Sequence, residues 1–144
     1  MQHSCKTHRR IALALQILAA VILGQTLFFK FSGAAESKYI FSTLGIEPWG
    51  RIGTGVLELI AAALLLAPRG AVYGAGMAAG LMVGAIGGHL TRLGIVVQND
   101  GGLLFGLALT VLLSSVLVLW LRRGEIPWIG PLLAPSCATN ASVR

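Results

Sequence analysis

Residues 49–90 read WGRIGTGVLELIAAALLLAPRGAVYGAGMAAGLMVGAIGGHL, two long apolar segments separated only by Pro68, Arg69 and Gly70. A helix rises about 1.5 Å per residue, so about 20 apolar residues cross a hydrocarbon core of roughly 30 Å. Proline stops the first segment, and the short turn that follows leaves room only for a tight reversal. We therefore predict an antiparallel hairpin of transmembrane helices over residues 49–67 and 71–90.

Similar apolar segments lie on both sides of this hairpin, at residues 11–29 and 103–121. The chain is 56% apolar and only 11% charged, whereas a soluble domain carries about 25% charged residues. Such a chain cannot cover a water-facing surface. We predict an all-α fold, an integral membrane four-helix bundle that forms a single domain over residues 1–144. The tails, residues 1–10 and 122–144, are expected to be flexible or interfacial.

The basic residues flank the apolar segments and predict the topology. In a soluble protein the net charge of +6 would suggest nucleic acid, but no basic face interleaved with aromatic residues is present, so we expect no nucleic-acid partner. One side of the predicted bundle carries Lys6, Arg9, Arg10, Arg69, Arg122 and Arg123, and the other carries Lys30, Lys38, Arg51 and Arg92 with Glu36, Glu47 and Asp100. The positive-inside rule then places both termini in the cytoplasm.

Cysteine usage gives no sign of redox or metal chemistry within the chain itself. Cys5 and Cys137 lie in the two polar tails, and neither belongs to a C-x-x-C pair or to a metal-ligand spacing. Both would face the reducing cytoplasm under this topology. We expect no structural disulfide, no thiol relay and no metal site.

Small residues recur every four positions on two of the predicted helices. The predicted packing residues are Gly76, Gly80, Gly84 and Gly88 on the third helix, and Gly106, Thr110 and Ser114 on the fourth. Helix association in lipid depends on close packing, which a small-xxx-small pattern permits. We interpret the series as packing surfaces. A nucleotide loop is excluded, because the helix already uses these amides.

A helical wheel places a second set of residues opposite these glycines on the third helix. The set consists of Ala75, Ala78, Met82, Ala85 and His89. This face is expected to turn toward a polar pocket around Glu58, while the glycine face packs against a neighbouring helix.

Glu58 lies near the middle of the second predicted helix, where a carboxylate is costly unless it is neutral, paired or hydrated. Its candidate partners are Lys30, Arg51, His89 and Arg92, with the amide of Gln25 nearby. This pattern predicts an outward-opening polar pocket with Glu58 as its floor. The alternative is a buried structural ion pair that fixes helix register, and the sequence leaves both open. Taken singly, His89 fits an interfacial histidine and the three cations fit snorkelling side chains.

Several short motifs resemble the DoxX family over about residues 10–121. They are FFKFSG at the end of the first segment, GRIGTGVLELIAAALLLAPRG in the second, HLT at the end of the third, and NDGG before the fourth. The resemblance implies a small four-helix protein of the bacterial or archaeal inner membrane. The family takes its name from a subunit of an archaeal thiosulfate:quinone oxidoreductase, and other members are linked to membrane redox complexes and oxidative-stress defence. Lys30 matches the family's lysine after the first helix, and Glu58 matches its acidic residue in the second. The resemblance carries over no catalytic set.

Three functions follow as hypotheses. The first is a quinone-linked redox subunit, in which a quinone is the candidate cofactor and a partner protein or substrate supplies electrons. The second is a non-catalytic membrane partner that docks through its glycine ridges, onto another protein or a second copy of itself. The third, a small proton-linked transporter, ranks last because the chain has no internal inverted repeat. The lipid bilayer is an expected partner in all three.

Overall fold

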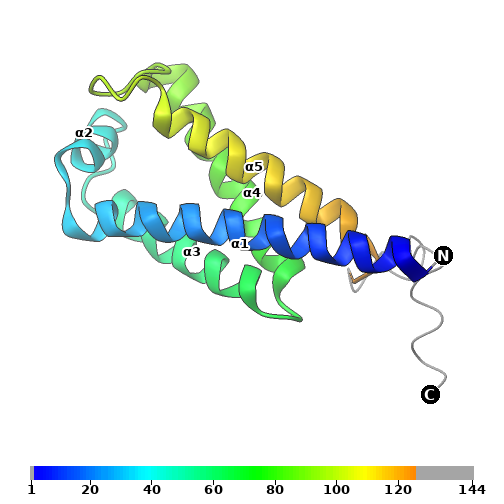
Figure 1. Ribbon diagram of the computed structural model, residues 1–144. Helices are drawn as coiled ribbons and strands as arrows, with labels where there is room; N and C mark the ends of the chain where they lie inside the picture. The colour runs from blue at the N-terminus through cyan, green and yellow to red at the C-terminus, as the bar shows by residue number, and fades with distance from the viewer. Residues whose placement is uncertain (1, 126–144) are drawn as a thin grey trace.

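The computed structural model describes residues 2–125, with side chains from residue 7 onward, and is helical throughout apart from its connections (Figure 1). Its elements are α1 (Gln2–Ser32), α2 (Ala35–Thr43), α3 (Trp49–Leu66), α4 (Ala71–Gly88), the π-helical turn η1 (His89–Leu93), α5 (Leu103–Leu121) and the 3-10 turn η2 (Arg123–Glu125). Four segments are long and apolar enough to cross a membrane: Thr7–Ser32, Trp49–Leu66, Ala71–Leu93 and Leu103–Leu121. The prediction of an all-helical fold with four such helices is confirmed.

The first helix is longer than the sequence predicted. It begins at Gln2 rather than near residue 11, because the stretch QHSCKTHRR over residues 2–10 contains no proline or glycine to stop it. Residues 2–10 therefore continue α1 as a helix. The predicted flexibility of the C-terminal tail falls mostly on residues 126–144, which lie outside the described residues, as does Cys137.

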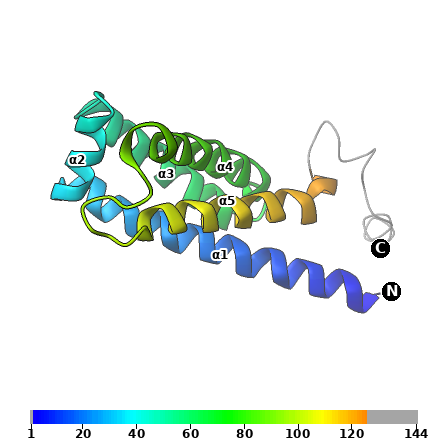
Figure 2. The ribbon, with the colours of Figure 1, turned by 90° about the horizontal axis from the view of Figure 1, so that it is seen from above.

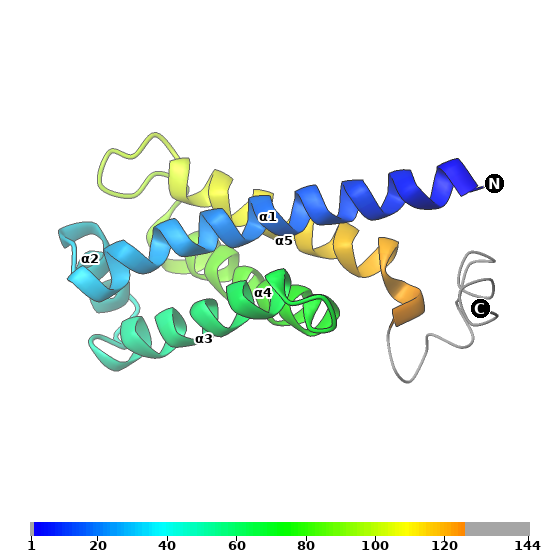
Figure 3. The same ribbon diagram turned by 60° about the horizontal axis from the view of Figure 1, so that its bottom comes forward.

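The four long helices form a closed ring of neighbours. α1 packs against α3 and α5, and α4 packs against α3 and α5. The start of α1, the turn between α3 and α4, and the end of α5 lie at one end of the bundle (Figures 1 and 3). α2 and the loop before α5 lie at the opposite end (Figure 2). The cytoplasmic position of the termini stays a prediction.

Alanines form much of the core at the meeting of these helices. Ala19, Ala61, Ala75 and Ala78 are fully buried, with larger side chains such as Leu23, Leu65 and Val111 between them. The closest approach is at Gly74, just after the turn into α4. A Cβ atom there would lie 2.5 Å from the backbone nitrogen of Leu65 and 2.8 Å from the carbonyl oxygen of Ala61. Only glycine lets the backbones of α3 and α4 meet this closely.

The glycine ridge of α4 does not pack inside the bundle. Gly76, Gly80 and Gly84 are exposed, and a Cβ added at any of them would meet no described atom within 4 Å. The same holds for Gly106 on α5. A helix can turn only one face inward, and the face carrying Ala75, Ala78 and Met82 buries methyl groups that glycine lacks. Core packing therefore selects the alanine face of α4.

The remaining members of the predicted packing series behave differently from one another. Gly88 faces Leu44, whose Cδ2 would lie 3.6 Å from an added Cβ. Ser114 is buried in the core. The Thr110 hydroxyl donates 2.8 Å back to the carbonyl oxygen of Gly106 on its own helix. Ser114 is therefore the one buried residue of the predicted packing series, and Gly88 and Thr110 are half-buried.

Asp100 organises the loop that leads into α5. Its carboxylate accepts backbone N–H groups from Val97 at 2.8 Å, from Gly102 at 2.9 Å and from Leu104 at 3.0 Å. The bond from Leu104 satisfies one of the backbone N–H groups that the start of α5 leaves without a helical partner. Burial raises the pKa of Asp100, but the bonds from Leu104, Gly102 and Val97, with a contribution from His89, lower that pKa overall.

Replacing Asp100 with alanine is expected to destabilise the protein by about 1 kcal/mol, the usual loss for a helix cap. A carboxyl group with a lowered pKa in the folded state stabilises the protein only while it is ionised. The contribution of Asp100 is therefore lost as the pH falls below about 3.9, the ordinary aspartate pKa. Thermal unfolding in detergent at a series of pH values should show a shallower acid loss in Asp100→Ala than in the unmodified protein. Parallel pH profiles would contradict this role.

Candidate functional site

Glu58 lies in the middle of α3 and faces α1, with a side chain only 6% exposed. The Lys30 ammonium donates to both of its carboxylate oxygens, at 3.0 and 2.8 Å. The Thr26 hydroxyl lies 3.2 Å from the Glu58 carboxylate and 2.8 Å from the carbonyl oxygen of Leu23, so its proton is shared between these acceptors. Thr26 and Lys30 are four residues apart and lie on the same face of α1.

Arg51 forms a second ion pair, nearer the end of the bundle at which α2 lies. Its Nε atom donates to the two carboxylate oxygens of Glu47, at 2.8 and 3.1 Å. Its Nη1 atom donates to the backbone carbonyl oxygen of Lys30, near the last turn of α1. Arg51 therefore satisfies a carbonyl that the end of α1 leaves without a helical partner, and it ties α3 to α1.

These five residues, Thr26, Lys30, Glu47, Arg51 and Glu58, form what we call the α1–α3 polar cluster. Its charges balance, because Lys30 pairs with Glu58 and Arg51 pairs with Glu47. Exposure of the side chains falls along the cluster, from 21% at Glu47 to 6% at Glu58. The cluster is thus closed at Glu58 and most accessible at Glu47.

The structure brings together only some of the partners predicted for Glu58. Lys30 pairs with it directly, whereas Arg51 joins the cluster through Glu47. Arg92 is exposed and forms no ion pair with any residue of the described chain, and Gln25 is exposed as well. Lys30 lies over the carboxylate, so an ammonium group occupies the place where the sequence predicted an open pocket.

His89 belongs to a different part of the structure. It is buried at the start of η1, its Nδ1 lies 2.8 Å from the carbonyl oxygen of Gly94, and its ring packs edge-on against Phe105 at 5.6 Å. Because Nδ1 faces a carbonyl, it carries the proton. His89 therefore fastens the loop after α4 to α5 and takes no part in the polar cluster. The face that leads to it along α4 is packed core, not the lining of a polar pocket.

Sequence reasoning did not select Thr26 or Glu47 as site residues. Each lies four residues before a residue that was selected, Thr26 before Lys30 and Glu47 before Arg51. Side chains at this spacing are neighbours on a helix surface, so the spacing was a usable signal for Thr26 on α1. Glu47 lies before α3, which begins at Trp49, so helical spacing gave no signal for it.

Comparisons with protein-family models, with curated proteins and with solved structures find no match to this chain. The class of protein is defined by the fold itself. Four long apolar helices, with a charge-balanced cluster between α1 and α3, make the chain a helical multi-pass membrane protein. Within the described residues, no three His, Cys, Asp or Glu side chains come together as a metal-binding group.

Proposed function

We propose that the chain is a DoxX-like protein of the bacterial inner membrane, with both termini in the cytoplasm, that serves as a subunit or accessory of a quinone-linked redox system. The observation that supports this proposal is the Lys30–Glu58 ion pair between two apolar helices, α1 and α3, with N–O distances of 3.0 and 2.8 Å. Ionisable residues in a membrane span are expensive and tend to mark functional sites.

The Lys30 ammonium has enough N–H donors to bind a carbonyl oxygen of a quinone head group in addition to Glu58. A lysine ammonium carries three N–H donors, and Glu58 accepts two of them. The Lys30 side chain is 15% exposed, so a remaining donor is available to a carbonyl oxygen at the surface of the bundle. When bound, a quinone supplies the redox chemistry, accepting electrons and protons as it is reduced to the quinol. Lys30 would orient its carbonyl, and Glu58 would hold the Lys30 ammonium in place. A partner protein or substrate would supply the electrons.

Quinone retention tests this proposal. The protein is purified in a mild detergent, and bound ubiquinone and menaquinone are quantified by mass spectrometry after extraction. Lys30→Met, which keeps the length of the side chain but removes the donors, should lower retention about tenfold, as expected for the loss of a charge-assisted hydrogen bond. Glu58→Gln should lower retention as well. Lys38→Met is the matched control, because Lys38 is exposed at the same end of the bundle. Equal retention in all three variants, or no quinone in any membrane mimic, would contradict the proposal.

The outward-facing glycine ridge favours a second candidate, a non-catalytic partner protein. Gly76, Gly80 and Gly84 form a flat strip on α4 that no described residue covers, and such strips allow close helix association in lipid. Under this candidate, Gly80→Leu would abolish co-purification with the partner, and Glu58→Gln would leave it intact. Gly53→Leu is the control, because Gly53 is also exposed and free of contacts, but on α3.

A further inference from the structure

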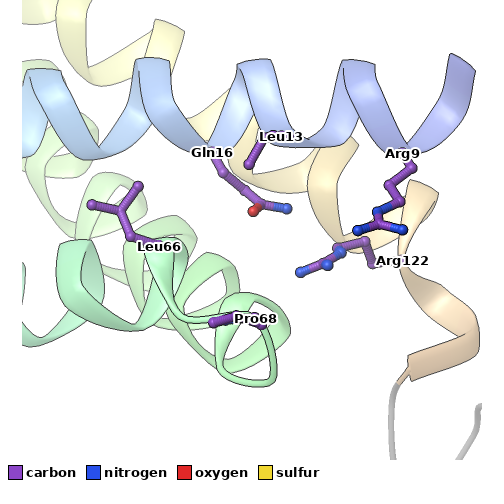
Figure 4. A pocket seen from close by; sticks show the side chains of 6 residues that line it. All are labelled: Arg9, Leu13, Gln16, Leu66, Pro68 and Arg122. Carbon is purple, nitrogen blue, oxygen red and sulfur yellow. The ribbon is translucent and has the colours of Figure 1, made fainter. Parts of the chain in front are cut away.

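A small groove lies at the end of the bundle opposite α2, far from the polar cluster. It has a volume of about 160 Å³ and is lined by Arg9, Leu13, Gln16, Leu66, Pro68 and Arg122. α1 supplies the first three residues, the end of α3 and its turn supply the next two, and the end of α5 supplies Arg122 (Figure 4). We call it the arginine groove.

Arg122 enters the groove with part of its guanidinium unsatisfied. Its Nε atom pairs with Glu125 at 3.2 Å, but its Nη1 atom is buried and has no hydrogen-bond partner among the described residues. A buried N–H donor without an acceptor is unfavourable, and more so when it carries charge. Figure 4 shows this guanidinium extending into the space between α1 and the turn at Pro68. The position calls for an acceptor, and an anionic one fits best.

Gln16 provides a second polar group in the same place. It is only 4% exposed, and its side-chain amide makes no hydrogen bond recorded among the described residues. The amide points into the space between α1 and Arg122 (Figure 4). A buried amide facing a cavity offers two N–H donors to whatever fills that cavity.

Arg9 completes the set from the outer edge of the groove. It is seven residues before Gln16 and therefore lies on the same face of α1. It forms no salt bridge within the described part of the chain. The groove is lined by no carboxylate, and Glu125, the acidic partner of Arg122, is 52% exposed outside it. Two guanidinium groups and an amide donor thus converge on one small space.

We propose that the arginine groove binds a phosphate group. Guanidinium groups form paired, charge-assisted hydrogen bonds with phosphate oxygens, and basic pockets between transmembrane helices take anionic lipid headgroups. Leu13 and Leu66 border the groove and are 53% and 57% exposed, which gives an acyl chain an apolar surface directly beside the phosphate position. The phosphate thus belongs to a phospholipid headgroup or to free phosphate, and the experiment below separates the two sources. The proposal is independent of quinone binding.

Native mass spectrometry of the detergent-solubilised protein tests the proposal with phosphatidylglycerol, phosphatidylcholine and inorganic phosphate as probes. We expect Arg122→Gln and Arg9→Gln each to weaken phosphatidylglycerol binding about tenfold, the loss of one charge-assisted contact. Arg10→Gln is the matched control: it removes the same charge from the same end of α1, and Arg10 does not line the groove. Displacement of the lipid by millimolar inorganic phosphate would identify free phosphate as the source. Persistence of the lipid would identify the headgroup.

Two further variants keep the test decisive if an arginine variant folds poorly. Gln16→Leu retains both arginines and should still weaken phosphatidylglycerol binding. Arg122→Lys retains the charge but loses the paired geometry, so its affinity should fall between those of Arg122→Gln and the unmodified protein. If Arg9→Gln, Arg122→Gln and Gln16→Leu all bind phosphatidylglycerol and phosphate as Arg10→Gln does, the proposal is wrong.

Discussion

Lys30→Met is expected to destabilise the bundle by about 3–5 kcal/mol, the usual cost of leaving one member of a buried ion pair without its partner. Glu58 is only 6% exposed, and without Lys30 it would keep only the shared hydroxyl of Thr26 as a donor. Unfolding of the purified protein in mixed micelles, followed by circular dichroism, measures the loss. A Lys30→Met variant as stable as Lys38→Met would contradict the importance of this pair.

The double variant Lys30→Met/Glu58→Leu separates a structural role from a functional one. Replacing a buried pair with apolar residues is often neutral, so we expect the double variant to recover most of the stability lost by Lys30→Met. If the pair serves only to fix helix register, every other property should recover with stability. If it serves a quinone, the double variant should be stable and should still fail to retain quinone.

The second large effect is expected at Gly74. Gly74→Ala would place a Cβ atom 2.5 Å from the Leu65 nitrogen and 2.8 Å from the Ala61 oxygen, both backbone atoms that cannot rotate away. Separating α3 from α4 to relieve this overlap should cost about 3 kcal/mol, the upper part of the usual range for overpacking. The same unfolding assay measures the effect.

Gly80→Ala is the matched control on the same helix. It meets no described atom within 4 Å, and alanine is the better helix former by about 1 kcal/mol. We therefore expect Gly80→Ala to be neutral or slightly stabilising. Equal losses at Gly74 and Gly80 would show that glycine flexibility, rather than close packing of the hairpin, determines the effect.

The sequence was sufficient for the existence of the four long helices and for the choice of Glu58 as a residue that needs a partner. Apolar length is read directly from the chain, and the turn at Pro68 left little choice for the hairpin. Glu58 was identifiable because a carboxylate in the middle of an apolar segment must be compensated. Lys30 was among the few cations within reach.

The orientation of α4 could not be predicted, because small residues line both of its faces. When every residue of a helix is apolar or small, periodicity gives the spacing of a ridge but not the side that faces the core. The fully buried Ala75 and Ala78 and the exposed Gly76 and Gly80 show how the choice is made. His89 lies just beyond α4, at the start of η1. There its Nδ1 atom bonds to the carbonyl oxygen of Gly94 and not to Glu58.

Contacts between helices explain what else the sequence left open. The bond from Arg51 to the Lys30 carbonyl depends on how α2 returns the chain to α3. The arginine groove depends on three separate segments meeting at one end of the bundle. In the sequence Gln16 is one polar residue in an apolar segment, and Arg122 is a topology signal.

The unequal lengths of the helices also bear on the kind of membrane that suits this protein. α3 has 18 residues and α5 has 19, lengths of about 27–29 Å, whereas α1 has 31 residues and reaches about 46 Å. α4 also has 18 residues, and these three short helices set the hydrophobic thickness of the bundle slightly below the roughly 30 Å of an average bilayer. Lipids with long acyl chains must compress around the protein, and those with shorter chains match it without distortion. We therefore expect the stability of the whole bundle to depend on the acyl-chain length of the surrounding lipids. The turns of α1 that exceed the hydrocarbon thickness would extend into the headgroup region.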